Sequence, residues 1–313
     1  MTVSQPVRAP RRRTALALAA AAAALVVTGC GGGPTLPGAA ATVGDDRISV
    51  EQLQSQVDSV LTFRGGPENA AVRDQLPTIT QQVLSGEVQR ALVARAVQRT
   101  NLPVDEQAIA DQVARIDPKV LDGQGVTFIT PQTLPQFVHD QLVIAQLGAT
   151  SWDSLAVVAD LTTATDQADA EAKARRMAES PESSRAVVDE AKAQGQQTQV
   201  GYPLSPAVLE GLAGSPLFAA AEGSGIAFRL DQQWQAARIV SRTTTAPKTT
   251  SADAVDASQA QASSTYALGV TLLQELAGNP EVRVNPRYGT WDPYQGQVVN
   301  ESDPRSVVFS PRS

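Results

Sequence analysis

Apolar residues recur every three or four positions through the first half of the chain, the spacing of helices that bury one face. A short extended pair over 41–49, turning at two acidic residues, precedes the first helix. Ser49 is followed three residues later by Gln52, which is the spacing of a capping box, so this helix is predicted to begin there. Gly65-Gly66-Pro67 is expected to end it. The pattern predicts a small helical domain that opens with a β element.

Three further helices follow from the same spacing. They are a helix over 78–99, one opened by Pro103 and Asp105, and, after a glycine-rich loop at Gly123 and Gly125, one over 131–147. The positions expected to face the core are Val50, Leu53, Val57, Val60 and Leu61; Ile79, Val83, Leu84, Val88 and Leu92; Ile109, Val113 and Ile116; and Leu134, Phe137, Val138 and Leu142.

After Trp152 the pattern changes to a mixture of strands and helices. It predicts a strand over 155–161, helices over 166–177 and 186–194, a broken helical stretch over 205–221, and strands over 226–230 and 234–241 joined by a tight turn. Residues 244–263 are polar and predict a linker. A helix over 266–276 and a strand over 281–284 follow, and the tail over 292–313 is expected to be loosely ordered.

The N-terminus has the composition of a secretory signal, with four arginines and then an apolar run that ends near Val27. Val27-Thr28-Gly29-Cys30 is similar to bacterial lipoprotein signals, in which the cysteine thiol receives diacylglycerol and the chain is cut just before it. Residues 1–29 are therefore predicted to be a signal peptide, 30–40 a flexible tether, and Cys30 a lipid anchor that holds the protein on the outer face of the cell membrane. The alternative is that Cys30 is an unmodified thiol of a secreted protein. The apolar run is shorter than the ~20 residues that a membrane-spanning helix needs.

Charge and cysteine content narrow the function. Without residues 1–29 the net charge of −7 becomes −11, because 21 basic side chains then face 32 acidic ones. This net negative charge argues against a nucleic-acid partner, which would need a basic surface. Cys30 is the only cysteine, so no intramolecular disulfide can form and stability must come from buried apolar area.

The order of elements resembles the SurA/PrsA/trigger-factor group of extracytoplasmic chaperones. Residues 43–49 (VGDDRIS) look like that group's opening Val-Asn-Gly-x-x-Ile-Thr, and 284–291 (VNPRYGTW) resembles actinobacterial lipoproteins of the group. The resemblance implies an α+β fold in which a helical chaperone domain over 41–150 is completed by 264–291. It also implies that 151–243 is an inserted unit similar to a parvulin-type prolyl isomerase.

Parvulins use two histidines and an acid or cysteine beneath an apolar proline pocket. Matched to that pattern, Asp160 and Gln235 stand at the histidine positions and Gln199 at the acid, while Leu217 and Phe218 are candidates for the pocket wall. All three polar positions depart from the pattern. We therefore predict a degenerate parvulin-like domain without catalytic residues, with the glutamine-rich stretch 197–201 matched to that family's acid-bearing turn.

No other motif predicts catalysis or a cofactor. His139 is the only histidine and is expected to lie at the surface or at the boundary of the core rather than to act as a base or ligand. Apart from Cys30, the chain has no cysteine or further histidine that could complete a zinc site with it. Asp45 and Asp46 are better explained as turn formers than as calcium ligands. No nucleophile elbow, phosphate loop or dinucleotide fingerprint occurs, so neither a metal nor a cofactor is predicted.

Three functions remain open on these grounds. The first is a membrane-anchored chaperone for unfolded exported polypeptides, without isomerase catalysis. The second is an active peptidyl-prolyl isomerase with an unusual residue set. The third is an envelope scaffold with one dedicated partner.

Overall fold

The opening β element forms as the sequence predicts. In a computed structural model of the chain, which describes residues 36–66, 68–117, 120, 128–248, 254–300 and 305–311, β1 (Ala39–Val43) and β2 (Asp46–Ser49) pair antiparallel. Gly44 takes the turn at a φ of 57°, a conformation that favours glycine. The first two residues of β1 were included in the predicted tether, but they are buried in the fold. Cys30, its neighbours Val27, Thr28 and Gly29, and the loop at Gly123 and Gly125 lie outside the described residues.

Two of the predicted helices of the first half begin directly after a capping side chain. Ser49 Oγ accepts the Gln52 backbone N–H (3.0 Å), and Asp105 Oδ1 accepts that of Ala108 (3.0 Å), so both predicted N-termini are confirmed. A short helix that was not predicted follows the first. The helices are α1 (Val50–Phe63), α2 (Ala70–Asp74), α3 (Leu76–Thr100), α4 (Glu106–Val113) and α6 (Leu134–Trp152).

One position was assigned to the wrong surroundings, since Leu142 was expected to face inward but is 38% exposed. Ile116 lies beyond the end of α4 but packs against the same cluster as Ile109, as expected of a core-facing residue. The buried stripe of α6 shifts along its length because its two halves pack against different clusters. Its first turns face α4 through Leu134 and Val138, whereas its second half faces the main core through residues such as Ile144.

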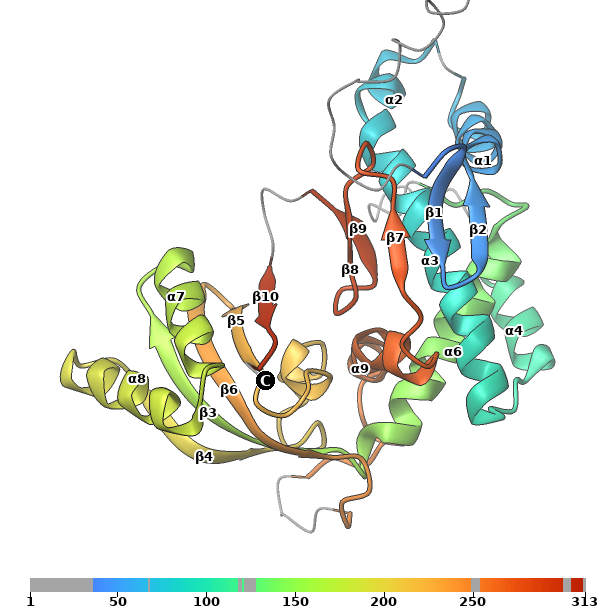
Figure 1. The fold of residues 1–313 in the computed structure, drawn as a ribbon. Helices are drawn as coiled ribbons and strands as arrows, with labels where there is room; N and C mark the ends of the chain where they lie inside the picture. Colours follow the sequence, from blue (N-terminus) through green and yellow to red (C-terminus); the bar gives the residue numbers. More distant parts are fainter. Residues whose placement is uncertain are drawn as a thin grey trace, which may run out of the picture. The chain divides into compact units, whose positions relative to one another are not determined.

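The C-terminal part of the chain completes the N-terminal lobe. α9 (Ala262–Leu276) packs along α6, and β7 (Val282–Val284) pairs with β1 to give a three-stranded sheet in the order β2-β1-β7 (Figure 1). Ala41 stands opposite Val284, and Leu273 belongs to the same core cluster as Leu84 and Leu92 of α3. The prediction that the last helix and strand return to the opening bundle is confirmed.

A second hairpin extends this lobe beyond the predicted end. β8 (Thr290–Asp292) and β9 (Gln297–Val299) lie on α3, where Gln81, Ser85 and Gln89 stand one turn apart. Gln81 Nε2 donates to the Tyr288 carbonyl, Ser85 Oγ accepts the Val298 N–H, and Gln89 Nε2 donates to the Gly296 carbonyl, at 2.7–2.9 Å. The prediction of a loosely ordered tail was therefore wrong for these residues, whose strands are too short for their pattern to stand out.

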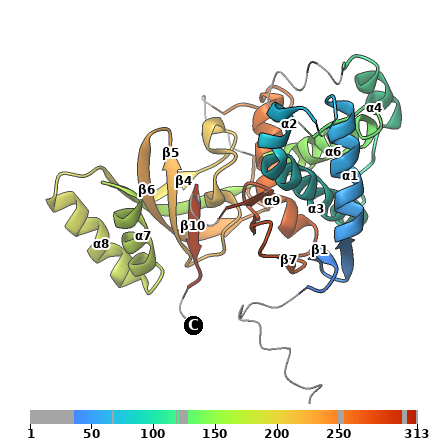
Figure 2. The ribbon, with the colours of Figure 1, turned by 90° about the horizontal axis from the view of Figure 1, so that it is seen from above.

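The middle of the chain forms a five-stranded antiparallel sheet with two helices on one face (Figure 2). The strand order is β10-β5-β6-β3-β4. The elements are β3 (Ala156–Ala164), α7 (Gln167–Met177), α8 (Pro181–Ala193), β4 (Thr198–Leu204), β5 (Gly225–Leu230), β6 (Gln233–Thr243) and β10 (Ser306–Phe309).

Four details of this unit differ from the sequence analysis. Residues 197–201, expected as a turn, lead into and form part of strand β4, and the second helix begins at Pro181, directly after its N-cap Ser180. Residues 205–221 form turns and two short 3₁₀ helices, η1 (Glu210–Leu212) and η2 (Pro216–Phe218), because prolines and glycines interrupt any longer helix. β10 gives the sheet a fifth strand from the predicted tail.

The described end of the predicted linker is folded onto the same unit. Trp152 Nε1 donates to the Val255 carbonyl (2.8 Å), and the Val255 N–H donates to the Ala207 carbonyl (2.7 Å). Ala254 and Ala257 pack against the core between the sheet and α9. This packing is made by small alanine side chains within a polar stretch. The polar composition of the stretch predicted a linker and gave no sign of these contacts.

Candidate functional site

The two predicted pocket residues lie inside the core of the sheet unit. Leu217 and Phe218 of η2 have no exposed surface. They pack with Ile226 and Ile239 of the sheet and with Leu268 of α9. In this structure they form part of the packed core rather than the wall of an open pocket.

Asp160 lies on the helical face of the sheet. The residue is 6% exposed, and its carboxylate accepts hydrogen bonds from the Ser184 hydroxyl of α8 (3.0 Å) and the Gly201 N–H of β4 (2.9 Å). These two hydrogen bonds join β3, β4 and α8. Asp160 also lines a groove of about 410 Å³, together with Arg185 and Arg238.

The two glutamines lie on the other face. Gln235 of β6 stands opposite Thr163 and alternates with Ala237, which packs against η2. Gln199 of β4 is exposed and stands opposite Leu161, which packs in the same cluster. Because Asp160 points the opposite way, the three polar positions do not converge on one site.

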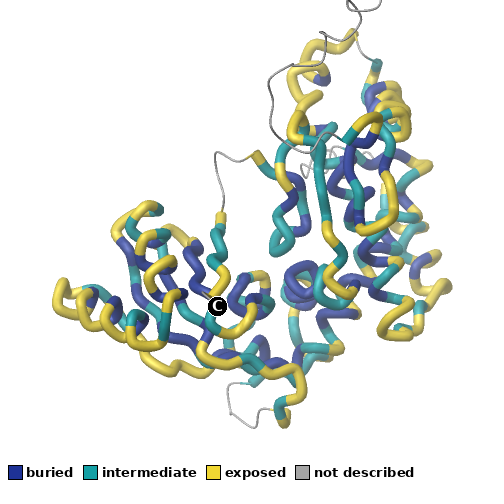
Figure 3. Tube along the Cα trace, viewed as in Figure 1, coloured by how far each residue is buried: buried dark blue, intermediate teal, exposed yellow. Residues whose placement is uncertain are grey.

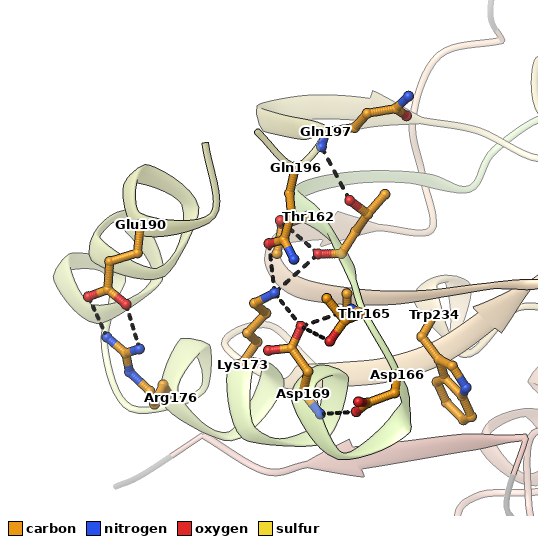
Figure 4. A network of polar contacts seen from close by, with 12 residues as sticks. Thr162, Thr165, Asp166, Asp169, Lys173, Arg176, Glu190, Gln196, Gln197 and Trp234 are labelled. Carbon is orange, nitrogen blue, oxygen red and sulfur yellow. Dashed lines mark hydrogen bonds and ion pairs between the residues drawn. The ribbon is translucent and has the colours of Figure 1, made fainter. Parts of the chain in front are cut away.

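A buried lysine organises a second polar network on the helical face (Figure 4). Lys173 Nζ donates to Asp169 Oδ2 (2.6 Å), to Gln196 Oε1 (2.7 Å) and to the Thr163 carbonyl (3.3 Å). Burial raises the pKa of Asp169, but the hydrogen bonds from Lys173 and Thr165 outweigh it and leave that pKa below its ordinary value. The network fixes α7 to the end of β3.

The N-terminal lobe has a groove of about 850 Å³ between α1 and the segment that precedes α6. Most of the described residues that line it are polar, and they include two acids and no base. The lining residues are Glu51, Gln54, Ser55, Gln56, Asp58, Ser59, Thr62, Phe63, Thr130, Pro131, Gln132 and Thr133.

A small cavity with partly apolar walls adjoins this groove. Gln56 and Thr133 also line this cavity of about 40 Å³, which lies among Val60, Phe128 and Phe137. The two phenylalanine rings meet edge to face, with their centroids 5.8 Å apart. A polar-rimmed groove with an aromatic end suits the binding of a polypeptide segment that carries an apolar side chain.

Two buried carboxylates border the same cavity. Glu87 of α3 accepts Arg90 Nη1 (2.5 Å) and Gln52 Nε2 (2.5 Å), and Arg90 Nε lies 3.6 Å from Asp140 Oδ2 on α6. His139 Nδ1 lies 3.0 Å from the other oxygen of Asp140. One guanidinium therefore lies between two carboxylates beside the small cavity.

Neither the groove nor these acids were predicted from the sequence. A signal for the acids was available, since Glu87 and Asp140 occupy positions on the predicted apolar faces, spaced from Val83 and Phe137 like the core residues. A buried acid at such a position needs a partner, and Arg90 supplies it. The groove itself depends on segments far apart in the chain. Among the described residues no cluster of His, Cys, Asp and Glu could hold a metal ion, and no helix is long and apolar enough to cross a bilayer.

The N-terminal region is similar to a known protein family. Residues 8–125 match the family model of the SurA-like N-terminal domain. No curated protein sequence matches the chain. Among solved structures, the crystal structure of the foldase protein PrsA from Lactococcus lactis is similar over 80% of this chain and 95% of that one, at 11% sequence identity and a TM-score of 0.26. The match over residues 8–125 agrees with the resemblance of the opening segment to the SurA group.

Proposed function

We propose that this protein is an extracytoplasmic chaperone that is anchored to the membrane through a lipid on Cys30 and holds unfolded exported polypeptides without isomerising their prolines. The observation that carries the proposal is the SurA-like domain over residues 8–125. The lipoprotein-like segment Val27-Thr28-Gly29-Cys30 supports the location and the anchor.

The groove of the N-terminal lobe is the proposed client site. Unfolded chains expose apolar side chains separated by polar backbone, and a polar-rimmed groove with an aromatic end accommodates both. Its acidic walls favour client segments that carry lysine or arginine. Clients are bound by this non-directional chemistry and not by a sequence motif.

The absence of isomerase catalysis is proposed from the sheet unit. Asp160 and Gln235 occupy opposite faces, and Leu217 and Phe218 are enclosed by the core. A proline ring has no open apolar pocket at these positions. In this proposal the sheet unit supports α9 and, through α9, the N-terminal lobe.

Aggregation of a chemically unfolded client, followed by light scattering, tests the proposal. The mature chain with Cys30→Ser should slow aggregation at near-equal molar ratio. Ser59→Arg places a long charged side chain in the groove and should weaken that protection severalfold. Ala110→Arg adds the same side chain to an exposed position of α4 and should leave protection unchanged. A mature chain that slows the aggregation of no client would contradict the proposed function.

A further inference from the structure

One edge of the five-stranded sheet is covered by the end of the chain itself. β10 pairs antiparallel with β5 over four residues, from Ser306 opposite Phe228 to Phe309 opposite Gly225. The Arg229 N–H adds a bond to the Arg305 carbonyl (3.3 Å). This strand lies more than 70 positions after β5 in the sequence and is the outermost strand of the sheet.

β10 is held by few contacts. Each of its four residues is only half-buried, and Figure 3 shows it as intermediate along its length. Val308 packs on one face of the sheet, while Phe309 packs on the other beneath the Arg175 guanidinium, which lies 4.6 Å from the ring centroid. An anchor of two alternating side chains and a short ladder is a weak attachment.

The β5 edge beneath it has the properties of a peptide acceptor. Ile226, Ala227 and Phe228 are almost fully buried, and the strand pairs without a bulge on both of its sides. A bare edge of this kind presents unpaired backbone groups next to apolar side chains. Extended peptides bind such edges by main-chain hydrogen bonds, with pockets for alternate side chains.

The opposite edge of the sheet is built differently. β4 contains an irregularity in its pairing with β3, a glycine at a φ of 60° (Gly201) and a proline (Pro203). Bulges and prolines are how natural sheets prevent another strand from adding to an edge. The β5 edge carries none of these features over 225–228 and relies on β10 to cover it.

We propose that the β5 edge is a second polypeptide-binding site, which takes extended client segments with alternating apolar residues and which Ser306–Phe309 fill when no client is present. The inference rests on the proposed chaperone function and adds to it a substrate class. A tethered strand competes at an effective concentration of about millimolar, so a client must displace it. The apparent client affinity is therefore reduced by the fraction of molecules in which the edge is open.

A disulfide that locks β10 in place tests this in the whole mature chain. In a Cys30→Ser background, Ala227→Cys with Val307→Cys joins two directly opposed residues, whose Cβ atoms are expected about 5 Å apart. Thr162→Cys with Thr198→Cys joins an opposed pair at the other edge as the matched control. The probe is a fluorescent peptide with the sequence of residues 305–311, and its binding is measured by anisotropy with and without reductant.

The oxidised Ala227–Val307 lock should bind the peptide at least tenfold more weakly than its reduced form, and the control lock should bind equally in both states. Phe309→Ala removes the stacking on Arg175, so β10 leaves more often and peptide affinity should rise severalfold. Equal binding by the oxidised and reduced lock, or no peptide binding by Phe309→Ala, overturns the inference. Exchange of β10 between two copies without peptide binding overturns it as well.

These outcomes are separable from failure of the proposed function. If unlocked protein binds the peptide in a lock-sensitive way but never slows client aggregation, the strand site stands and the chaperone function does not. If locked and unlocked proteins slow aggregation equally and bind no peptide, the chaperone function stands and this site is wrong.

Discussion

Gly148 of α6 and Gly269 of α9 face each other where the two helices cross. A Cβ on Gly148 would lie 2.7 Å from the Gly269 backbone nitrogen and 1.9 Å from the Thr265 carbonyl oxygen. A Cβ on Gly269 would lie 1.9 Å from the Ile144 carbonyl oxygen. The backbones therefore touch, and this contact fixes the C-terminal helix to the N-terminal lobe.

Gly269→Ala should destabilise the protein by about 2 kcal/mol or more, because a single methyl group forces two helices apart. The loss exceeds the ~1 kcal/mol that alanine gains over glycine within a helix. Urea unfolding of the mature chain measures it.

Gly86→Ala is the matched control, since a Cβ there meets only Phe128 at an ordinary 3.6 Å. This variant should unfold at the same or higher urea concentration. If Gly269→Ala behaved in the same way, α6 and α9 would not be in backbone contact.

Ser85→Ala should loosen the β8–β9 hairpin. The buried Val298 N–H would lose its acceptor, at a cost of about 1–3 kcal/mol. Hydrogen exchange at residues 290–299 should accelerate more than in the helices. Thr80→Ala on the same helix removes a similar hydroxyl bond to the Leu76 carbonyl and should leave the hairpin unchanged.

Local signals predicted the parts of the fold that depend on local physics. Ser49 and Asp105 correctly predicted where their helices begin, because a capping side chain bonds to a backbone N–H only three residues away. The turn at Asp231 was found because it lies between two clear strand patterns. The link between residues 41–49 and 281–284 came from resemblance, since nothing within either segment specifies a partner so far away.

What the sequence did not reveal depends on contacts between distant segments. β9 and β10 have three and four residues, too few for a period to be recognised, and each is ordered by a surface built elsewhere, on α3 or β5. The sequence also did not predict which face of the sheet Asp160 and Gln235 would lie on. Placing them on opposite faces requires the register of β3 against β6, which a single strand does not encode.

Acid should weaken the attachment of α7 through Asp169. The folded protein holds the pKa of this carboxyl below its ordinary value of 3.8, so the ionised form favours folding. That stabilisation is complete above the ordinary pKa and is lost as the pH falls below about 4. Unfolding midpoints in urea should therefore fall between pH 6 and pH 3.

Asp169→Asn should reduce this fall and should also lower stability at pH 7 by about 1–2 kcal/mol, because buried Lys173 loses a charged partner. Asp111→Asn, on the exposed side of α4, is the control for removing one carboxylate. A pH profile unchanged by Asp169→Asn would show that this network does not contribute to the acid response.

Cys30 should carry the membrane anchor. A fatty-acid analogue fed to expressing cells should label the wild-type chain, and the label should be lost in Cys30→Ser, which is expected in the soluble envelope fraction. Two acyl chains bury enough methylene groups for stable anchoring. Among the described residues no helix is long and apolar enough to cross a bilayer. Equal membrane retention of both proteins would contradict the anchor.

Prolyl isomerisation should proceed at the spontaneous rate in the presence of the mature chain. Rotation about the bond has a barrier of about 18–20 kcal/mol, and lowering it requires groups that converge on one proline ring. Here Asp160 is engaged by Ser184 and Gly201 on the helical face, while Gln235 lies on the other. A protease-coupled assay with a proline peptide measures the rate.

The same geometry predicts that restoring the parvulin residues fails. Asp160→His with Gln235→His should remain inactive, because the two rings would lie on opposite sides of the sheet and Phe218 would still fill the space behind η2. The double variant should also lose stability, since Ser184 and Gly201 lose their shared acceptor. A rate above the spontaneous one in either protein, abolished when position 235 is changed to alanine, would show that the sheet unit catalyses after all.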